Sequence, residues 1–385
     1  MKNKIAAFLV IYFSFAVSAF VFQSIPPLLP VLEESFNLTT LKSGLLMSVY
    51  TILGIVIGLF CIDLLRKFKG RDLIITANFL TFIGLILPLH CKTFDYLLIG
   101  RVLSGGGMTL LTIISPTFVS KLFKENGKAS KFLGIYSTGM PIATITAFYL
   151  LPILERKFGQ FFFLKLSLIL SIVVIFLSIL FYRDSGEEKE EVKVNDHIKF
   201  NWKLILPLSL VWLLFNAGVL SFMTFGYSFA IQKKFLSYGL ASTICSSTMI
   251  GGLLLGTFTG NILDKKKSFP GYLLAVGCFL ISLGFLLFYF SKLYFLAIIF
   301  LIIGGGIVPT SVFSFPHIFN LKPLEKTFGI IAAFLSIGSF LGPFIVGFLF
   351  TQGKELYAIL LQVLFLILAS IIGIFYLTRA QRARE

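Results

Sequence analysis

The stretch that decides the fold is RVLSGGGMTLLTIISPTFVSKLFKENGKASKFLGIYSTGMP, residues 101–141. It begins with an arginine inside an apolar run, continues through three consecutive glycines and a short basic loop, and enters a second apolar run. Arg101 lies five to seven residues inside its run, a depth of roughly 8–10 Å at about 1.5 Å per helical residue. Because a charge at membrane depth is costly, such a residue usually has a function. The stretch therefore predicts membrane-spanning helices that carry a functional charge.

The composition places the rest of the chain in the membrane as well. Of 385 residues, 57% are hydrophobic and only 13% are charged, and the mean hydropathy is +0.96, which is unlike a soluble domain. A helix needs roughly 20 apolar residues to cross the ~30 Å hydrocarbon core. The sequence contains twelve such runs and so predicts an all-α integral membrane protein with twelve transmembrane helices. They lie near 5–30, 43–62, 73–90, 94–120, 132–153, 160–182, 204–230, 239–262, 271–290, 293–319, 328–350 and 356–378.

The basic residues indicate how the runs are oriented. The net charge of +16 would by itself suit a nucleic-acid partner. However, 23 of the 33 basic residues fall in loops on the side of the N-terminus, 8 in loops on the other side, and two, Arg101 and Lys165, within runs. Cytoplasmic loops of membrane proteins are the ones enriched in Lys and Arg. We therefore predict that both termini are cytoplasmic and that the basic character reflects topology rather than nucleic-acid binding.

The second half of the chain repeats features of the first. A polar segment separates six runs from six, so we predict an N-terminal half at 1–182, a linker at 183–203 and a C-terminal half at 204–385. Several coincidences at nearly one offset indicate a duplicated six-helix unit. Two pseudo-symmetric halves with a site between them form one architecture of secondary transporters. The correspondences are Asp63–Gly70 with Asp264–Gly271, Gly105–Gly107 with Gly304–Gly306, and Gly139 with Gly338.

These residues resemble the major facilitator superfamily over essentially the whole chain. The superfamily's signature between spans 2 and 3 is approximated by Gly58–Arg71, with Gly58 one residue too far from the aspartate, and 260–265 keeps the glycine-to-aspartate spacing. Arg101, followed by Gly105 and Gly107, resembles the fourth-span arginine motif. The resemblance implies a secondary transporter that works by alternating access, not an enzyme.

Other motifs bear on the branch of the superfamily. Gly139-Met-Pro141 resembles the fifth-span antiporter motif but lacks its Gly-Gly end, which weakens an assignment to the drug antiporters. Leu28–Pro30 and Gly134–Pro141 resemble segments of the cyanate/nitrate-like and organic-anion branches.

The positions of the acidic residues indicate which charge the solute carries. All 17 fall in loops, tails or the ends of runs, and Glu33 lies beyond Pro30 on the outer side. In the superfamily that the chain resembles, proton-driven sugar symporters and many drug antiporters use a buried carboxylate, whose pKa is raised by desolvation. Because no run contains one in its interior, we expect a small solute that is anionic or neutral, with an anion favoured. The alternative is a proton-coupled exporter of drug-like amphiphiles, which the 46 Phe residues favour.

Polar residues within the runs are the predicted substrate contacts. The guanidinium of Arg101 is a planar fork of donors that suits carboxylate, nitrate or phosphate. The others could bind a solute or simply hydrogen-bond a neighbouring helix, which is the common role of polar groups in bundles. His317 is the candidate for coupling, because imidazole titrates near neutral pH. The predicted substrate-binding residues are Arg101, Gln23, Asn216, Tyr136 and Tyr227.

Charges at the cytoplasmic ends of spans are the predicted gating residues. If their ion pairs exist only when that side is closed, they favour the outward-facing state. An ordinary loop ion pair, worth under about 1 kcal/mol, is the simpler interpretation. In the first half they are Asp63 with Arg66, Lys67 and Arg71, and in the second half they are Asp264 and Lys265.

The remaining residues limit cofactors and partners. The four cysteines are scattered without CxxC or Cys/His spacing, so we expect neither a metal nor a disulfide framework, and no cofactor or catalytic residues. The expected partners are a small-molecule solute and membrane lipid, without nucleic acid. We expect a monomer that spans the cytoplasmic membrane many times.

Overall fold

The structure, a computed structural model, describes residues 2–60, 67–90, 93–123, 129–159, 161–181, 201–265, 270–321 and 324–377. These residues form helices joined by short turns, and no strand occurs among them. Twelve spans are long and apolar enough to cross a membrane. The predicted fold class, an all-α membrane protein with twelve transmembrane helices, is therefore confirmed.

The helices follow the apolar runs closely. Most begin or end where the sequence changes from apolar to charged or to proline and glycine, as expected when burial in lipid decides the element. In chain order they are α1 (Lys2–Gln23), α2 (Ile25–Phe36), α3 (Thr40–Ser48), η1 (Val49–Thr51), α4 (Ile52–Leu59), α6 (Gly70–His90), α7 (Phe94–Phe123), α8 (Ala129–Ser137), α9 (Gly139–Phe158), α10 (Phe162–Phe181), α11 (Trp202–Gln232), α12 (Tyr238–Lys265), α13 (Pro270–Phe290), α14 (Tyr294–Ile318), α15 (Leu324–Thr351), α16 (Glu355–Ile372) and the π-helical turn η2 (Gly373–Leu377).

Contacts divide the chain into two compact units. The first contains Met1–Leu28 and Val49–Asp196, and the second contains Leu29–Ser48 and His197–Glu385. The second span therefore belongs to both units, because α3 groups with the second and α4 with the first. Between these two helices the backbone forms the single 3₁₀ turn η1, a conformation that often marks a hinge inside a helix.

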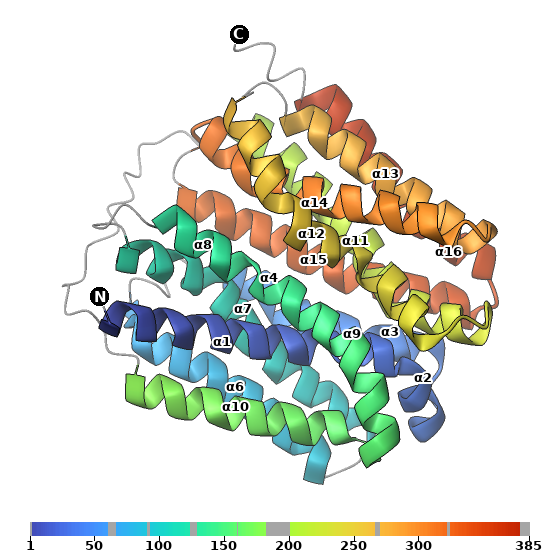
Figure 1. Ribbon diagram of the computed structural model, residues 1–385, viewed down its shortest axis with the longest axis horizontal. Coiled ribbons are helices and arrows are strands. Elements are labelled where there is room, and N and C mark those ends of the chain that lie inside the picture. The colour runs from blue at the N-terminus through green and yellow to red at the C-terminus, as the bar shows by residue number, and fades with distance from the viewer. Residues whose placement is uncertain are drawn as a thin grey trace. The chain divides into compact units, whose positions relative to one another are not determined.

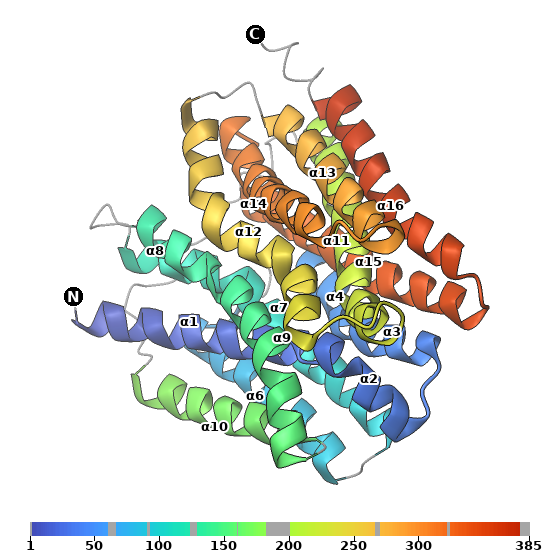
Figure 2. The same cartoon turned by 45° about the vertical axis from the view of Figure 1, so that its right-hand side comes forward.

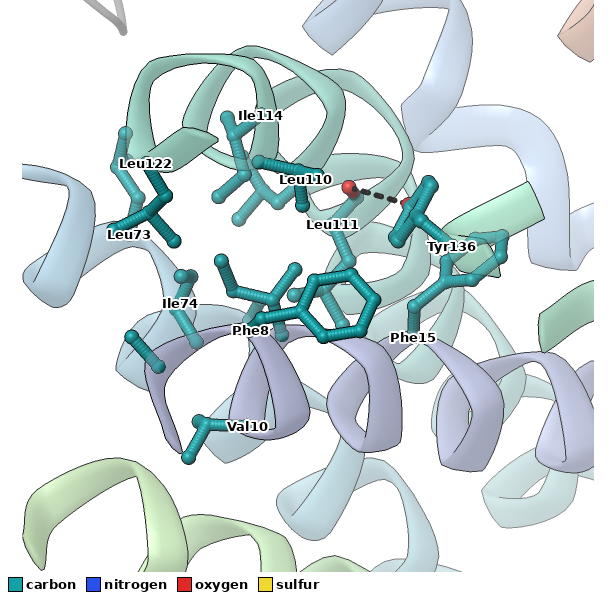
Figure 3. Packing of buried hydrophobic residues seen from close by; sticks show 14 of the residues in the cluster. Phe8, Val10, Phe15, Leu73, Ile74, Leu110, Leu111, Ile114, Leu122 and Tyr136 are labelled. Atoms are coloured by element: carbon teal, nitrogen blue, oxygen red, sulfur yellow. Dashed lines mark hydrogen bonds between the residues drawn. The ribbon is translucent and has the colours of Figure 1, made fainter. Parts of the chain in front are cut away.

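In the first unit, α1 packs against α7, α9 and α10. The helices α1, α6 and α10 run side by side (Figure 1). A hydrophobic cluster joins α1 to α6, α7 and α8 and includes Phe8, Leu110 and Tyr136 (Figure 3). The amide of Asn78 on α6 ties three helices together, because its nitrogen donates to the hydroxyls of Ser14 (3.0 Å) and Ser178 (2.9 Å).

In the second unit, α13 lies between α14 and α16 (Figure 2). The helix α11 packs on α15 and α16, and α12 packs on α14. The hydroxyl of Tyr289 on α13 donates to the amide oxygen of Gln362 on α16 at 3.1 Å. This polar contact is buried, so it fixes the rotation of both helices about their axes.

The glycine triplets have matching roles in the two units. A Cβ added to Gly105 would collide with the backbone carbonyl of Tyr50 in η1, and one added to Gly305 would collide with the backbone of Thr248 in α12. Each triplet thus allows the fourth span of a unit to touch the backbone of the second span, as small residues do at helix interfaces in membranes. The correspondence supports the predicted pseudo-symmetry.

The helix α3 is held on α15 within the second unit. A Cβ on Gly44 would collide with the carbonyl oxygen of Pro343, and one on Gly347 would lie 2.6 Å from the carbonyl oxygen of Thr40. Beside this close approach, the backbone N–H of Leu41 donates to the hydroxyl of Thr351 at 2.8 Å. Small residues and polar contacts of Thr351 with Thr40 and Leu41 therefore fasten the outer part of the second span to α15.

Candidate functional site

The most unusual group in the first unit is the guanidinium of Arg101, which is only 4% exposed. One of its terminal nitrogens donates to the carbonyl oxygen of Val21 at 2.7 Å, and the other donates to that of Phe22 at 3.0 Å. Both carbonyls belong to the last turn of α1. The arginine on α7 therefore caps the end of another transmembrane helix.

The sequence around Ser24 explains why α1 needs this cap. The helix breaks at Ser24 between α1 and α2, and the first proline of α2 is Pro26. Proline has no N–H, so Pro26 cannot donate to the carbonyl four residues earlier, which is that of Phe22. An unsatisfied carbonyl in an apolar interior is costly. Arg101 supplies the missing donor, and charge-assisted hydrogen bonds of this kind are among the stronger ones.

The aromatic ring of Tyr50 completes the surroundings of the guanidinium. The central carbon of the Arg101 guanidinium lies 4.1 Å from the centroid of the Tyr50 ring, a cation–π distance. The Tyr50 hydroxyl donates to the carbonyl oxygen of Ser18 at 3.0 Å, and its backbone is the one that Gly105 approaches. The arginine is thus fixed between the break in α1 and the 3₁₀ turn of the second span.

Gln23 adjoins this cluster and has an unusual side chain. It is 1% exposed, and neither its amide oxygen nor its amide nitrogen has a hydrogen-bond partner among the described residues. Leaving such a group unsatisfied costs roughly 1–3 kcal/mol. A buried polar group of this kind is suited to a ligand that supplies the missing hydrogen bonds, so Gln23 joins Arg101 as a candidate contact.

A small cavity adjoins the arginine on the side of α6 and α10. It has a volume of about 10 Å³, and its polar lining comes from Ser24, Arg101 and Ser104. Such a volume is about that needed for one water molecule. The cavity is far too small for a solute, and a buried water is the occupant that its size and lining suit.

The predicted contacts of the second unit lie on one helix. Asn216 and Tyr227 are eleven residues apart on α11, close to three turns, so they share one face of the helix. The amide nitrogen of Asn216 donates to the carbonyl oxygen of Trp212 at 2.7 Å, and Tyr227 is 1% exposed. The indole nitrogen of Trp212 is buried with no hydrogen-bond partner among the described residues. Sequence reasoning missed Trp212, although Trp is rare in this chain.

Two other predicted residues lie in different surroundings. Tyr136 packs in the hydrophobic cluster of the first unit, with its ring 4.7 Å from that of Phe15 and its hydroxyl directed at the carbonyl oxygen of Leu111 at 3.3 Å (Figure 3). His317 is exposed near the end of α14, and its ring lies 5.7 Å from that of Phe328. Within the first unit, Tyr136 thus belongs to the hydrophobic cluster and not to the surroundings of Arg101.

The predicted gating residues are only partly visible. Asp63 and Arg66 lie outside the described residues, and so do the side chains of Asp264 and Lys265. Lys67 is exposed, and a terminal nitrogen of Arg71 donates to the carbonyl oxygen of Ile179 at 3.1 Å. The ion pairs expected from the loop signature therefore remain predictions.

Twelve apolar spans, a discontinuous first helix and buried polar groups at the break are features of a secondary transporter. The chain belongs to the Major Facilitator Superfamily, whose sequence model matches residues 11–321. It is a multi-pass membrane transporter of small-molecule solutes and not an enzyme.

Solved structures support the same fold. The chain is similar to a bacterial homologue of the human lysosomal transporter Spinster in an inward-facing and occupied conformation, with 15% identity, a TM-score of 0.73, and coverage of 100% of this chain and 98% of that one. The unoccupied inward-facing structure of such a homologue gives 14% identity, a TM-score of 0.72, and coverage of 99% and 98%. At this level of identity the similarity concerns the fold.

Proposed function

We propose that this transporter moves a small anionic solute by alternating access. The observation that carries the proposal is the buried guanidinium of Arg101, bonded to the carbonyl of Phe22, together with the buried and unsatisfied amide of the next residue, Gln23. An amide nitrogen can donate to an anion, and a positive charge in a poorly solvated site attracts one. We further infer a monomer in the cytoplasmic membrane, with both termini cytoplasmic and its lipid-facing surface in contact with membrane lipid.

The positions of the acidic residues support an anion over a cation. Within the described spans, Asp72 and Asp95 lie in the first turn of their helices. Glu155 lies in the last turn of α9, where its carboxylate accepts a hydrogen bond from the backbone N–H of Phe163 at 2.6 Å. Asp72 and Asp95 thus lie at helix N-termini, where acidic side chains are favoured, and Glu155 accepts from the first turn of α10. A cationic solute would therefore lack a counter-ion in the interior of these spans.

Arg101 can act on an anion without giving up its hydrogen bonds to α1. A unit charge at a distance of about 6 Å gains roughly 3 kcal/mol from the guanidinium at an effective dielectric constant near 20. The same hydrogen bonds fix the backbone at the end of α1, and this also fixes the position of the next residue, Gln23. In this proposal Arg101 attracts the anion electrostatically and positions Gln23, and the side-chain amide of Gln23 donates a hydrogen bond to the anion.

Anion binding and uptake by purified variants test the proposal. Thermal shifts with nitrate, phosphate, acetate and lactate identify a binding anion, because a ligand of the folded state stabilises it by mass action. Uptake of that anion into proteoliposomes then compares Arg101→Ala, Arg101→Lys and Gln23→Leu with the parent protein. We expect losses of about ten- to hundredfold in affinity, because the charge of Arg101 contributes roughly 3 kcal/mol and the charge-assisted hydrogen bond of Gln23 roughly 1.5–3 kcal/mol. The exposed Lys165→Ala is the matched control and should transport normally.

The outcome also decides between the two functions. Normal anion uptake by Arg101→Ala, or binding of cationic amphiphiles alone, would reject the anion proposal and favour the proton-coupled exporter. Gln23→Leu keeps the charge of Arg101 and its hydrogen bonds to α1. It therefore gives an answer even where Arg101→Ala fails to insert.

A further inference from the structure

Glu33 occupies an unexpected position for a residue outside the spans. It lies on α2 and is half-buried. The hydroxyl of Ser43 on α3 donates to its carboxylate at 2.8 Å, and the side chain of Gln232 at the end of α11 forms a second hydrogen bond. One carboxylate thus joins three helices of the second unit. These bonds connect the α2–α3 hairpin, residues 29–48, to α11.

Burial dominates the electrostatics of this carboxyl. The pKa of Glu33 is raised above its ordinary value of 4.5 because desolvation of the charged form outweighs the two hydrogen bonds that favour it. The charged groups nearest in sequence on the packed elements are Glu34 on α2, Lys42 on α3, and Lys233 with Lys234 after α11.

Lys233, the residue that follows Gln232, forms an ion pair with a residue other than Glu33. The amine of Lys233 is paired with the carboxylate of Glu355 at 3.1 Å, and both side chains are at least half exposed. Burial raises the pKa of Glu33, and the hydrogen bonds with Ser43 and Gln232 lower it by less. Its protonation therefore follows how closely the hairpin packs on α11.

We propose that Glu33 is a proton-binding site that fastens the α2–α3 hairpin to the end of α11. A neutral carboxyl can stay buried among the three helices at little cost and can still accept a hydrogen bond, whereas a carboxylate favours water. Proton binding therefore stabilises the packed hairpin, and loss of the proton favours its release. The proposal concerns a proton and does not depend on the charge of the transported solute.

The direction of the pH effect follows from linkage. When the hairpin leaves α11, the carboxyl meets water and its pKa returns toward 4.5. The packed arrangement has the higher pKa and so binds the proton more tightly. Its extra stability is fully present below about pH 4.5 and is lost as the pH rises through the raised pKa. Between these two values the packing equilibrium should change by up to about tenfold per pH unit.

Hydrogen–deuterium exchange of the full-length protein in lipid nanodiscs tests this site without any solute. The reporters are peptides covering Thr40–Ser48, read between pH 4.5 and 8 and corrected for the intrinsic exchange rate. In the parent protein we expect their protection to fall with rising pH. Glu33→Gln imitates the protonated carboxyl, so its protection should stay high and independent of pH. Glu34→Gln on the exposed side of the same helix is the control and should follow the parent.

A second variant keeps the test decisive if Glu33→Gln folds poorly. Ser43→Ala removes a donor that stabilises the charged carboxylate, so the midpoint of the protection curve should move to higher pH. Unchanged pH dependence in Glu33→Gln would overturn the proposal. So would the same flat profile in Glu34→Gln, or a midpoint in Ser43→Ala that stays in place or moves to lower pH.

Discussion

Replacing Gly105 or Gly305, one glycine from each triplet, by alanine should destabilise the protein through one physical effect. A Cβ on Gly105 would overlap the carbonyl of Tyr50, and a Cβ on Gly305 would overlap the backbone of Thr248. Backbone cannot rotate away as a side chain can, so the two helices must separate. Overpacking of this kind costs about 1–3 kcal/mol, while alanine regains roughly 0.5–1 kcal/mol of helix propensity. We expect a net loss of about 0.5–2 kcal/mol for each variant.

The measurement is equilibrium unfolding in mixed micelles, in which a loss of about 1.4 kcal/mol changes the unfolding constant tenfold. Matched controls exist in both units, because a Cβ on Gly134 or on Gly239 meets no atom within 4 Å. Alanine at these two positions should be neutral or slightly stabilising. Gly105→Ala and Gly305→Ala should lose similar amounts, since each separates the corresponding pair of spans.

The reasoning fails in two recognisable ways. If the Gly105→Ala variant is as stable as the Gly134→Ala variant, the close approach of α7 to the second span does not contribute to the free energy of unfolding. If only one of the two triplets is sensitive, the halves are not equivalent in packing, and the pseudo-symmetry would be limited to topology.

Two other predictions use the same preparations. Reporter fusions after Lys199 and after Lys234 should report opposite sides of the membrane because the loops sort the basic residues 23 to 8, and a common side would contradict the topology. Asn78→Ala removes two buried hydrogen bonds between helices, so it should cost about 1–3 kcal/mol of unfolding free energy, whereas Thr112→Ala, which loses only a bond to the carbonyl of Met108 in its own helix, should change it little.

The sequence predicts the spans well because length and hydropathy are properties of single segments. A run of about 20 apolar residues has few alternatives to a membrane-spanning helix. Proline positions are equally direct, since Pro26 alone implies an unsatisfied carbonyl at Phe22. Both features follow from the chain without knowledge of its neighbours.

The site is harder to predict because it depends on which way each side chain points. Spacing gives the depth of Arg101 in the membrane but not that its donors reach the end of α1. Tyr136 and Gln23 are both polar residues in apolar runs, yet one has its hydroxyl at a backbone carbonyl and the other has no partner among the described residues. Glu33 looked like a residue of an outer loop, but α2 continues through it and packing half-buries it.

The grouping of residues 29–48 with the second unit has a consequence for dividing the chain. A fragment that starts at residue 204 would lack α3, so Gly347 and Thr351 on α15 would lose the helix that covers them. A fragment of residues 1–182 contains every helix of the first unit. In complementation experiments the N-terminal fragment should therefore insert alone, while the C-terminal fragment should be rescued only by a partner that brings the α2–α3 hairpin.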